Sequence, residues 1–402
     1  MILICFLQKG NSQLYFFAKV DYICQMQLSV IILNYNVRYF LEQCVLSVQK
    51  ALEGIDGEII VIDNNSSDDS CTMIKKFFPK VKLIENSSNL GFPKGNNSGV
   101  TQAKGEYICI LNPDTVVAED TFTKMLNTKN WQLNTGIIGC KLIDGTGNFL
   151  PESKRGIPTP WVAITKIFAL YKLFPKVSLF NKYYAQHLTQ NQSGKVDILV
   201  GAFMFMKREL YNEIGGFDEN CFMYSDDIDL SYMALKKGKY NFYFHETTVI
   251  HYKGESTIRD GTYLKRFQEA MQFFYKKHFD KSIFFDVFMK IGALIFSLFK
   301  KNQTKEVKRK IDEYVIFSND SLQLNSSKKV TILNDFSQFK NDLKSNIEII
   351  FDTKSFSYKE IIHFMNYNNS KNLTFKNYIS TSNYIIGSNN SIDRGEIIQL
   401  KN

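Results

Sequence analysis

The 402-residue sequence lacks the patterns that mark several common classes of protein. Its seven cysteines are odd in number, scattered and never spaced as C-x-x-C, so neither a disulfide framework nor a zinc site is indicated. The pattern G-x-x-x-x-G-K-[ST] is missing, which argues against a P-loop ATPase. This use of cysteine is typical of a protein of the reducing cytoplasm.

Long apolar runs are also scarce. The start "MILICFLQKG" has a short apolar run, no basic region before it and no small-residue cleavage site, so it is a poor signal peptide. A strand pattern follows Met26 at once, and we therefore predict that residues 1–25 are an upstream extension. We leave them out of the fold prediction.

The most apolar stretch, "SIFFDVFMKIGALIFSLFKK" at 282–301, is interrupted by Asp286 and Lys290. It falls short of the roughly 20 apolar residues that a membrane-spanning helix needs. We predict an interfacial helix at the inner membrane surface, with an ordinary packed helix as the alternative. Cations follow it closely, at Lys300, Lys301, Lys305, Lys308, Arg309 and Lys310.

The composition fits a globular chain of about two to three domains. Hydrophobic residues make up 44% and aromatic residues 14%, which is ample for a large core. The net charge of +9 is concentrated late in the chain, which indicates a local basic face and not a nucleic-acid-binding protein.

The first part of the chain alternates strand and helix patterns. Short, continuously apolar runs at 28–33, 58–63 and 107–111 are typical of strands buried on both faces. Helical spacing lies between the first two, and further helices are predicted from about 68 to 78 and from 95 to 104. The alternation predicts a parallel, Rossmann-like α/β sheet with helices on both faces.

Polar residues follow three of these strands, where ligands of such sheets gather. They are Asn34, Tyr35 and Asn36, then Asp63, Asn64 and Asn65, then Asn112, Pro113 and Asp114. We expect the three strand ends to converge on one crevice.

The domain boundaries follow from changes of pattern. We predict one domain over 26–280, an amphipathic and basic helical linker over 281–328, and a small α/β module over 329–402. The module is predicted from four strand patterns and one helix, and its role is left open.

The stretch "FMYSDDIDLSY" at 222–232 places three carboxylates within four positions after a run of aromatics. Like charges this close favour protonation of one another, so the stretch calls for a cation or a proton. An acidic helix N-terminus is the plain alternative, because carboxylates there stabilise the helix dipole. That alternative does not explain the preceding aromatics.

Five motifs in order resemble the inverting GT-A glycosyltransferases of family 2, above all their bacterial, rhamnosyltransferase-like members. They are "SVIILNYN", "EIIVIDNNSSDDS", "NSSNLGFPKGNNSGVTQAKGEYICILNPDT", "VGAFMFMKRELYNEIGGFDENCFMYSDDIDLSYMALKKGK" and "VIHYKGES". The resemblance covers about residues 26–280. It implies a GT-A fold, a nucleotide-sugar donor and a glycan acceptor.

The resemblance implies a metal site at Asp114 and His251. "NPDT" stands where the family has a metal-binding D-x-D motif, and Asn112 occupies the place of the first Asp. Hard oxygen ligands suit Mn²⁺ or Mg²⁺ bridging two phosphates. The alternatives are a simple turn for Asn-Pro-Asp-Thr and a structural role for the histidine.

The same resemblance makes Asp227 the candidate catalytic base. Inversion needs one base to take the proton of the acceptor hydroxyl while its oxygen attacks the anomeric carbon. Asp226 would orient the site or the acceptor, and Asp229 would lie close enough to tune both. Arg155 and Trp161 are assigned no role.

For the nucleotide, the resemblance implies the strand-end residues Asn34, Tyr35, Asn36 and Asp63, whose carboxylate can accept the imide N–H of uracil or thymine. The segment "NLGFPKGNNSG" would wrap the nucleoside through Asn89, Gly91, Phe92, Lys94 and Asn96. Glycine-rich loops are common, so this segment alone is a weak signal.

Together these expectations describe an inverting, metal-dependent transferase. It would move a sugar, best guess rhamnose, from a UDP- or dTDP-sugar to a lipid-linked or growing cell-surface polysaccharide, at the cytoplasmic face of the inner membrane. The alternative is a non-catalytic nucleotide-sugar or glycan-binding protein of the same fold. A sugar nucleotidyltransferase is disfavoured, because "NYNVRYF" replaces the glycine-rich loop expected after its first strand.

Overall fold

We analysed a computed structural model of the chain. The structure describes residues 3–10, 13–20, 26–168, 170–174, 177–253, 261–279, 310–320, 322, 324, 326–341, 343–389 and 395–400. The predicted interfacial helix and most of its basic tail lie outside these residues. Within them, no helix combines the length and the apolar character needed to cross a membrane.

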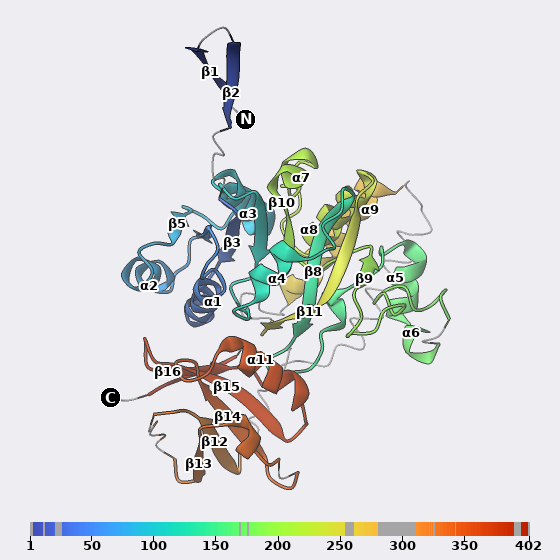
Figure 1. The fold of residues 1–402 in the computed structure, drawn as a ribbon. Helices are drawn as coiled ribbons and strands as arrows, with labels where there is room; N and C mark the ends of the chain where they lie inside the picture. Colours follow the sequence, from blue (N-terminus) through green and yellow to red (C-terminus); the bar gives the residue numbers. More distant parts are fainter. Residues whose placement is uncertain are drawn as a thin grey trace.

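A nine-stranded sheet forms the main body (Figure 1). Its strand order is β5-β4-β3-β6-β10-β8-β11-β7, with β9 paired to β11. The strands β3 (Leu28–Asn34), β4 (Gly57–Asp63), β5 (Lys82–Glu85) and β6 (Tyr107–Leu111) are parallel, as predicted. The predicted α/β class with a Rossmann-like sheet is therefore confirmed.

The second half of this sheet is mixed. β10 (Phe203–Lys207) runs antiparallel between β6 and β8 (Thr135–Ile143), and β11 (Tyr240–His251) runs parallel to β8. The short strands β7 (Thr115–Val116) and β9 (Gly194–Val196) both pair antiparallel with β11. The pairing of β7 with β11 places Thr115 opposite His251, which brings the predicted metal ligands Asp114 and His251 together.

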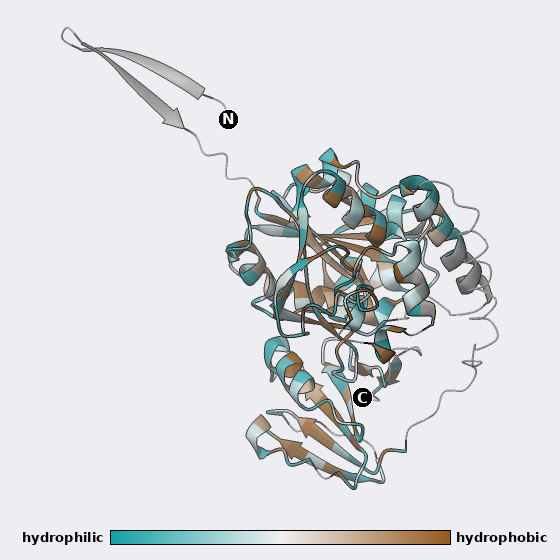
Figure 2. Ribbon diagram, turned by 90° about the vertical axis from the view of Figure 1, so that its right-hand side faces the viewer, coloured by the Kyte–Doolittle hydropathy of each residue, from teal (hydrophilic) through white to brown (hydrophobic). Residues whose placement is uncertain are grey.

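Helices cover both faces of the sheet because their apolar stripes pack on its continuously buried strands. They are α1 (Arg38–Ala51), α2 (Ser70–Phe77), α3 (Gly91–Thr101), α4 (Thr121–Asn127), α7 (Arg208–Glu213), α8 (Asp226–Lys236) and α9 (Gly261–His278). The short helices η1 (Pro151–Ser153), α5 (Pro160–Ile167) and α6 (Leu170–Leu173) lie between β8 and β9. Figure 2 shows hydrophobic strands flanked by helices of mixed polarity.

The C-terminal module is a six-stranded sheet of order β13-β12-β14-β15-β16-β17. Its elements are β12 (Glu313–Phe317), β13 (Lys329–Leu333), η2 (Phe336–Gln338), β14 (Ile347–Asp352), α11 (Tyr358–Tyr367), β15 (Leu373–Ile379), β16 (Tyr384–Gly387) and β17 (Glu396–Gln399). Since β12 is hydrogen-bonded to β14, the sheet begins inside the stretch that we had predicted as linker.

The two sheets share a hydrophobic core. Val37 and Phe40, at the start of α1, belong to one cluster with Phe351, Phe375 and Tyr384 of the module. Arg38 and Glu42 form a buried ion pair of 2.8 Å beneath this cluster, and Ser382 donates to Glu42. The module is therefore packed on the main body as part of one molecule.

The first 20 residues include two described strands, β1 (Leu3–Gly10) and β2 (Gln13–Val20). They pair antiparallel in a separate two-stranded sheet. Neither strand joins the nine-stranded sheet, whose first strand starts at Leu28 as predicted.

Candidate active site

The carboxyl ends of β3 and β4 bring Asn34 and Asp63 together, because the two residues are paired in register. The Asn34 amide donates to Asp63 Oδ1 at 2.7 Å, and Ser66 donates to the same carboxylate through its backbone N–H and its hydroxyl. Asn34 Oδ1 is buried without a partner among the described residues. This end of the sheet thus keeps acceptor capacity for an N–H of a ligand, and sequence reasoning missed Ser66.

Tyr35 and Asn36 form the turn that follows β3. Asn36 has a positive φ of 55°, and its side-chain oxygen accepts from the backbone N–H of Ser67 at 2.7 Å. That oxygen closes the turn. Tyr35 is half-buried beside it.

The predicted wrapping segment lies at the start of α3. Gly91 has a φ of +80°, and a Cβ there would approach the Phe222 ring to 2.8 Å, so glycine is needed. The Phe92 N–H donates to the Phe222 carbonyl at 3.0 Å. This segment is therefore tied directly to the acidic stretch that begins at Phe222.

The remaining predicted members of this segment differ in exposure. Asn89 is exposed and accepts from the Gly91 N–H, and Lys94 is exposed. Asn96 is fully buried, donates to the Phe92 carbonyl at 2.9 Å and leaves its Oδ1 without a partner among the described residues. Lys94 is thus free to face an anion, while Asn96 faces inward.

The two predicted metal ligands lie side by side. Asp114 follows β6, His251 ends β11, and Asp114 Oδ1 is 3.4 Å from His251 Nε2. The Asn112 amide is also 3.4 Å from that nitrogen, and both predicted ligands are buried. Within the described residues no three His, Cys, Asp or Glu side chains gather closely enough to hold a metal by themselves.

This donor set fits a cation that is shared with a substrate. Carboxylate oxygen and imidazole nitrogen both suit Mn²⁺, and Mg²⁺ is usually held by one or two carboxylates together with phosphates and water. His251 turns Nε2 toward Asp114 and leaves its buried Nδ1 without a partner among the described residues. With a metal bound, the pair would supply two ligands and the phosphates of a substrate would supply others.

An ion pair that the sequence did not predict adjoins the metal pair. Lys253, with a positive φ of 66°, contacts Glu152 of η1. Burial opposes ionisation of Glu152, but Lys253 and the nearby His251 hold its pKa below the usual value. A fixed carboxylate and a strained lysine thus border the site.

The acidic stretch begins α8, whose first turn carries Asp226, Asp227 and Asp229. Asp227 Oδ2 accepts from the Gly201 N–H at 3.0 Å and pairs with Arg155 Nη2 at 2.5 Å. Asp227 and Arg155 are largely buried, and Arg155 also donates to the Leu199 carbonyl. Arg155 therefore fixes the position of the predicted base, Asp227. The sequence analysis had assigned Arg155 no role.

Asp226 has a different environment. Burial and then the adjacent Asp227 charge raise the pKa of Asp226 to about 7. Its Oδ1 has no partner among the described residues. A carboxyl that is half protonated near neutral pH suits proton transfer.

Gly201 shows how closely the parts of the site approach. A Cβ at this position would lie 3.3 Å from Asp227 Cβ, 3.6 Å from Asp226 Oδ2 and 3.7 Å from the Phe92 ring. The predicted nucleotide segment and the acid pair therefore meet at one glycine, where the absent side chain leaves room.

The metal pair belongs to the same neighbourhood. Glu152 interacts electrostatically with His251 and also with Arg155, which holds Asp227. The predicted metal ligands and the predicted base are thus linked through one carboxylate and one guanidinium.

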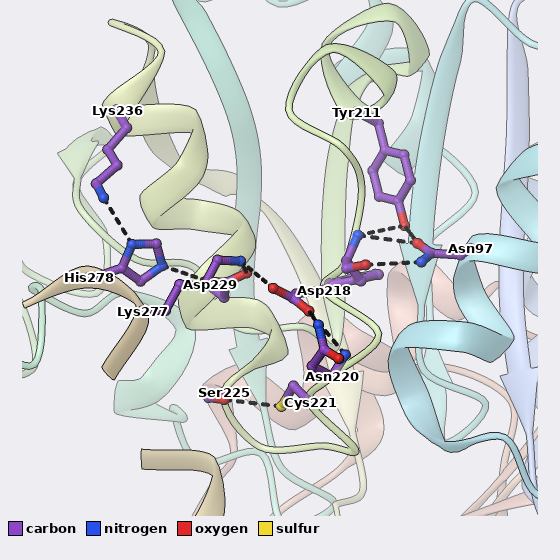
Figure 3. Close-up of polar contacts among 11 residues, drawn as sticks. Asn97, Tyr211, Asp218, Asn220, Cys221, Ser225, Asp229, Lys236, Lys277 and His278 are labelled. Atoms are coloured by element: carbon purple, nitrogen blue, oxygen red, sulfur yellow. Dashed lines mark hydrogen bonds and ion pairs between the residues drawn. The ribbon is translucent and has the colours of Figure 1, made fainter. Parts of the chain in front are cut away.

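Asp229, which was predicted to tune its two neighbours in α8, also has partners on another helix. Its carboxylate accepts from His278 Nε2 at 2.5 Å and from Lys277 Nζ at 2.8 Å, both on α9 (Figure 3). Lys277 also pairs with Asp218, and burial holds the pKa of His278 below its usual value. Asp229 therefore links α9 to α8, the helix that carries Asp226 and Asp227.

Comparison with known proteins finds similarity to glycosyltransferases. Residues 29–215 match the family described as Glycosyl transferase family 2. N-acetylglucosaminyl-diphospho-decaprenol L-rhamnosyltransferase of Mycobacterium tuberculosis is 25% identical over 244 residues, covering 58% of this chain and 78% of that protein. GalNAc(5)-diNAcBac-PP-undecaprenol beta-1,3-glucosyltransferase of Campylobacter jejuni is 30% identical over 182 residues, covering 42% and 57%.

Among solved structures, a mannosyltransferase from Pyrobaculum calidifontis in complex with GDP-Man and Mn²⁺ is similar to this chain. The TM-score is 0.42 at 18% sequence identity, and the match covers 68% of this chain and 70% of that one.

Proposed function

We propose that the chain catalyses an inverting transfer of one sugar to a lipid-linked or cell-surface glycan. The premise is that residues 29–215 belong to glycosyl transferase family 2 and that the chain is a glycosyltransferase. The donor is a UDP- or dTDP-sugar, with rhamnose as the best guess because a rhamnosyltransferase is among the relatives. The reaction takes place at the cytoplasmic face of the membrane. The buried acid pair at the start of α8, fixed by Arg155, carries the proposal.

The chemistry assigned to the pair is a single displacement. Asp227, held through Oδ2 by Arg155 and Gly201, takes the proton of the acceptor hydroxyl on its other oxygen. The acceptor oxygen attacks the anomeric carbon, and the bond to the nucleoside diphosphate breaks on the opposite face with its electron pair. Asp226, beside it, orients the acceptor.

Asp114 and His251 would hold Mn²⁺ or Mg²⁺, which when bound neutralises the charge on the departing diphosphate. At the other end of the crevice Asn34, Tyr35, Asn36 and Asp63 would receive the base of the nucleotide. The buried acceptor of Asn34 and the Asp63 carboxylate beside it suit an imide N–H.

The segment of Asn89, Gly91, Phe92, Lys94 and Asn96 would cover the nucleoside. Support comes from the contact of Phe92 with the Phe222 carbonyl and from the exposed Lys94, which can face phosphate. The segment would thereby join the donor to the acid pair.

A second candidate function is binding without catalysis. It is favoured by Asn112, which stands in place of one metal-binding carboxylate and contacts His251 instead. Retention of both carboxylates of the acid pair, one of them with a raised pKa, argues for catalysis.

The deciding experiment measures release of nucleoside diphosphate by the full chain with Mn²⁺ across a panel of UDP- and dTDP-sugars. We expect one donor to dominate, chelation to stop release, and Asp227→Asn to reduce turnover by about 1000-fold or more. The control is Asp56→Asn, an exposed aspartate at the start of β4.

Full turnover by Asp227→Asn would remove this residue as the base. Tight binding of UDP or dTDP without turnover of any donor or acceptor would establish the binding function instead.

A further inference from the structure

One segment of the main body exposes large apolar side chains to an unusual degree. Of fourteen such side chains that are exposed among the described residues, six lie between 161 and 179. We call them the 161–179 patch: Trp161 (43% exposed), Phe168 (48%), Leu173 (68%), Phe174 (48%), Val177 (43%) and Leu179 (51%). Apolar side chains gathered in this way mark an interaction site.

The patch is held together by its own contacts. The Trp161 indole donates to the Leu179 carbonyl at 3.0 Å, which ties α5 to the chain after α6. The Phe180 ring contacts Trp161 and Phe174 with centroids 6.0 and 5.4 Å apart. The apolar side chains are therefore presented on a folded surface at the β9 and β11 side of the sheet (Figure 1).

The charge of this segment has one sign. Between Glu152 and Asp197 the sequence holds no acidic residue and seven cations: Lys154, Arg155, Lys166, Lys172, Lys176, Lys182 and Lys195. Lys154 and Arg155 are largely buried and do not contribute to the surface charge. Lys172 and Lys182 are exposed beside the patch. Apolar residues mixed with cations, and no acids, are the composition of surfaces that enter the headgroup region of anionic bilayers.

The patch is connected to the acid pair through a short series of contacts. Lys166 of α5 contacts the Tyr183 hydroxyl and lies 3.9 Å from the centre of its ring. Burial would raise the pKa of Tyr183, but Lys166 and Arg155 hold it below the usual value. Gly156, next to Arg155, donates its N–H to the Tyr183 carbonyl at 3.1 Å, and Arg155 pairs with Asp227, so the segment that carries the patch also holds the proposed base.

We propose that the 161–179 patch is a membrane-docking surface that seats the chain on an anionic phospholipid bilayer. An acceptor with a lipid anchor would then reach Asp227 without leaving the bilayer. The placement of the acceptor rests on the proposed function, but membrane binding by the patch does not. Cation complementarity to anionic lipid favours the bilayer over a protein partner.

Sedimentation of the full chain with vesicles of phosphatidylglycerol and phosphatidylethanolamine, without donor, tests the proposal. The variant Leu173→Glu with Leu179→Glu is expected to lower the partition coefficient by about tenfold or more. The matched control is Leu343→Glu with Tyr367→Glu, which changes two side chains exposed by 76% and 72% on the C-terminal module. Both variants add the same charge, and circular dichroism verifies that both are folded.

A second pair of variants isolates the charge. Lys172→Gln with Lys182→Gln should weaken binding by about fivefold for each lysine. The control Lys129→Gln with Lys340→Gln changes exposed lysines elsewhere and should leave binding unchanged.

Tryptophan fluorescence gives a direct readout of contact. The chain has two tryptophans, and Trp131 is packed against Tyr107 and Phe205. Brominated acyl chains should therefore quench Trp161. The proposal is overturned if wild type does not sediment with anionic vesicles, if the patch variant binds like wild type, if the control loses as much, or if quenching is absent.

Turnover on a water-soluble acceptor separates this result from the proposed function. The Leu173→Glu, Leu179→Glu variant should retain it, so loss of vesicle binding with retained turnover supports the patch. Vesicle binding by a chain that turns over no donor would refute the proposed function and leave the docking surface standing.

Discussion

The two sheets of this molecule use their strand ends in opposite ways. In the nine-stranded sheet, the end of β3 carries a buried acceptor, Asn34 Oδ1, that has no partner among the described residues. In the six-stranded sheet, the end of β14 is closed by internal hydrogen bonds. Asp352, the last residue of β14, accepts from the hydroxyls of Ser318 and Ser355 and from the Lys354 N–H.

The neighbouring helix of the second sheet is closed as well. The first N–H groups of α11, from Tyr358 and Lys359, both donate to Glu119 of the main body at 2.8 Å. A helix N-terminus is a ready anion site, and here a carboxylate of the same chain fills it. Lys50 donates to the Thr353 carbonyl beside it.

This contrast separates two uses of the same topology. Parallel strands direct polar loops to one edge in both sheets. Where those loops satisfy one another, the edge serves packing between the two parts of the chain. Where they leave an acceptor without a partner among the described residues, as at Asn34, the edge is suited to a ligand.

Among the tests of this contrast, the largest effect is expected from exchanging the strand-end aspartates of the two sheets for asparagine. Asp114→Asn should reduce diphosphate release by about 100-fold or more, because it removes the carboxylate proposed to hold the metal. Asp352→Asn should instead lower the free energy of unfolding by about 1 to 3 kcal/mol, because buried hydrogen bonds lose their acceptor. Release assays and urea unfolding of both variants measure the difference.

If Asp352→Asn impaired turnover as strongly as Asp114→Asn while remaining folded, the contrast between the two edges would be wrong.

The next effect concerns Arg155, which contacts Asp227 Oδ2 at 2.5 Å. Arg155→Lys keeps the charge but loses the planar fork, and a small misplacement of the base is expected to lower kcat by about 10- to 100-fold. KM for the donor should change little, because Arg155 contacts the proposed base and not the residues proposed to bind the nucleotide. Added guanidinium should restore part of the rate, which a general loss of stability would not allow.

A third effect is the dependence of stability on pH. Because the pKa of Asp226 is raised from 3.8 to about 7, the folded state holds a proton that the unfolded state releases between these values. The free energy of unfolding should fall as pH rises through this window, by about 1.4 kcal/mol for each pH unit from this group alone.

Asp226→Asn should flatten that dependence and raise stability at pH 8, as urea unfolding at pH 5 and pH 8 would show. An unchanged slope in the variant would mean that Asp226 ionises normally in the folded state.

The smallest expected effect is on stability, at the contact between Glu119 and the N-terminus of α11 that closes the edge of the six-stranded sheet. Glu119→Gln removes the charge at the α11 N-terminus and should lower the free energy of unfolding by about 1 kcal/mol, with unchanged turnover. Lys359→Gln, which changes a side chain paired with Asp120 outside this contact, serves as the control. A loss of turnover in Glu119→Gln would show that the closed edge acts on the reaction.

Much of the first sheet was predictable, because its strands are continuously apolar and its turns polar. The predicted strands at 28–33, 58–63 and 107–111 agree with β3, β4 and β6. The helix predicted from residue 95 begins earlier, at Gly91, whose φ is positive. The apolar spacing of the sequence does not indicate this first turn. β12 was missed, because the Ser- and Asn-rich stretch after it was taken as the end of a linker.

The site was predictable where a residue acts beside its neighbours in sequence and less so where distant segments meet. The proximity of Asp114 and His251 followed from the motif resemblance. The partner of Asp227 did not, because Arg155 lies 72 residues away and reaches it through its pairing with Ile198, just after β9. The orientation of Asp229 also depends on α9, whose packing no local pattern encodes.

The continuous core between α1 and the C-terminal module restricts how this chain can be recombined. Val37 and Phe40 follow directly after the turn of Tyr35 and Asn36, which is proposed to bind the nucleotide. Their side chains are nevertheless buried in one cluster with Phe351 and Tyr384. A chimera that exchanged only the C-terminal sheet would leave the outer surface of α1 without its matching partner. A chimera that folds must therefore exchange α1 and the C-terminal sheet together, so that both sides of their shared core match.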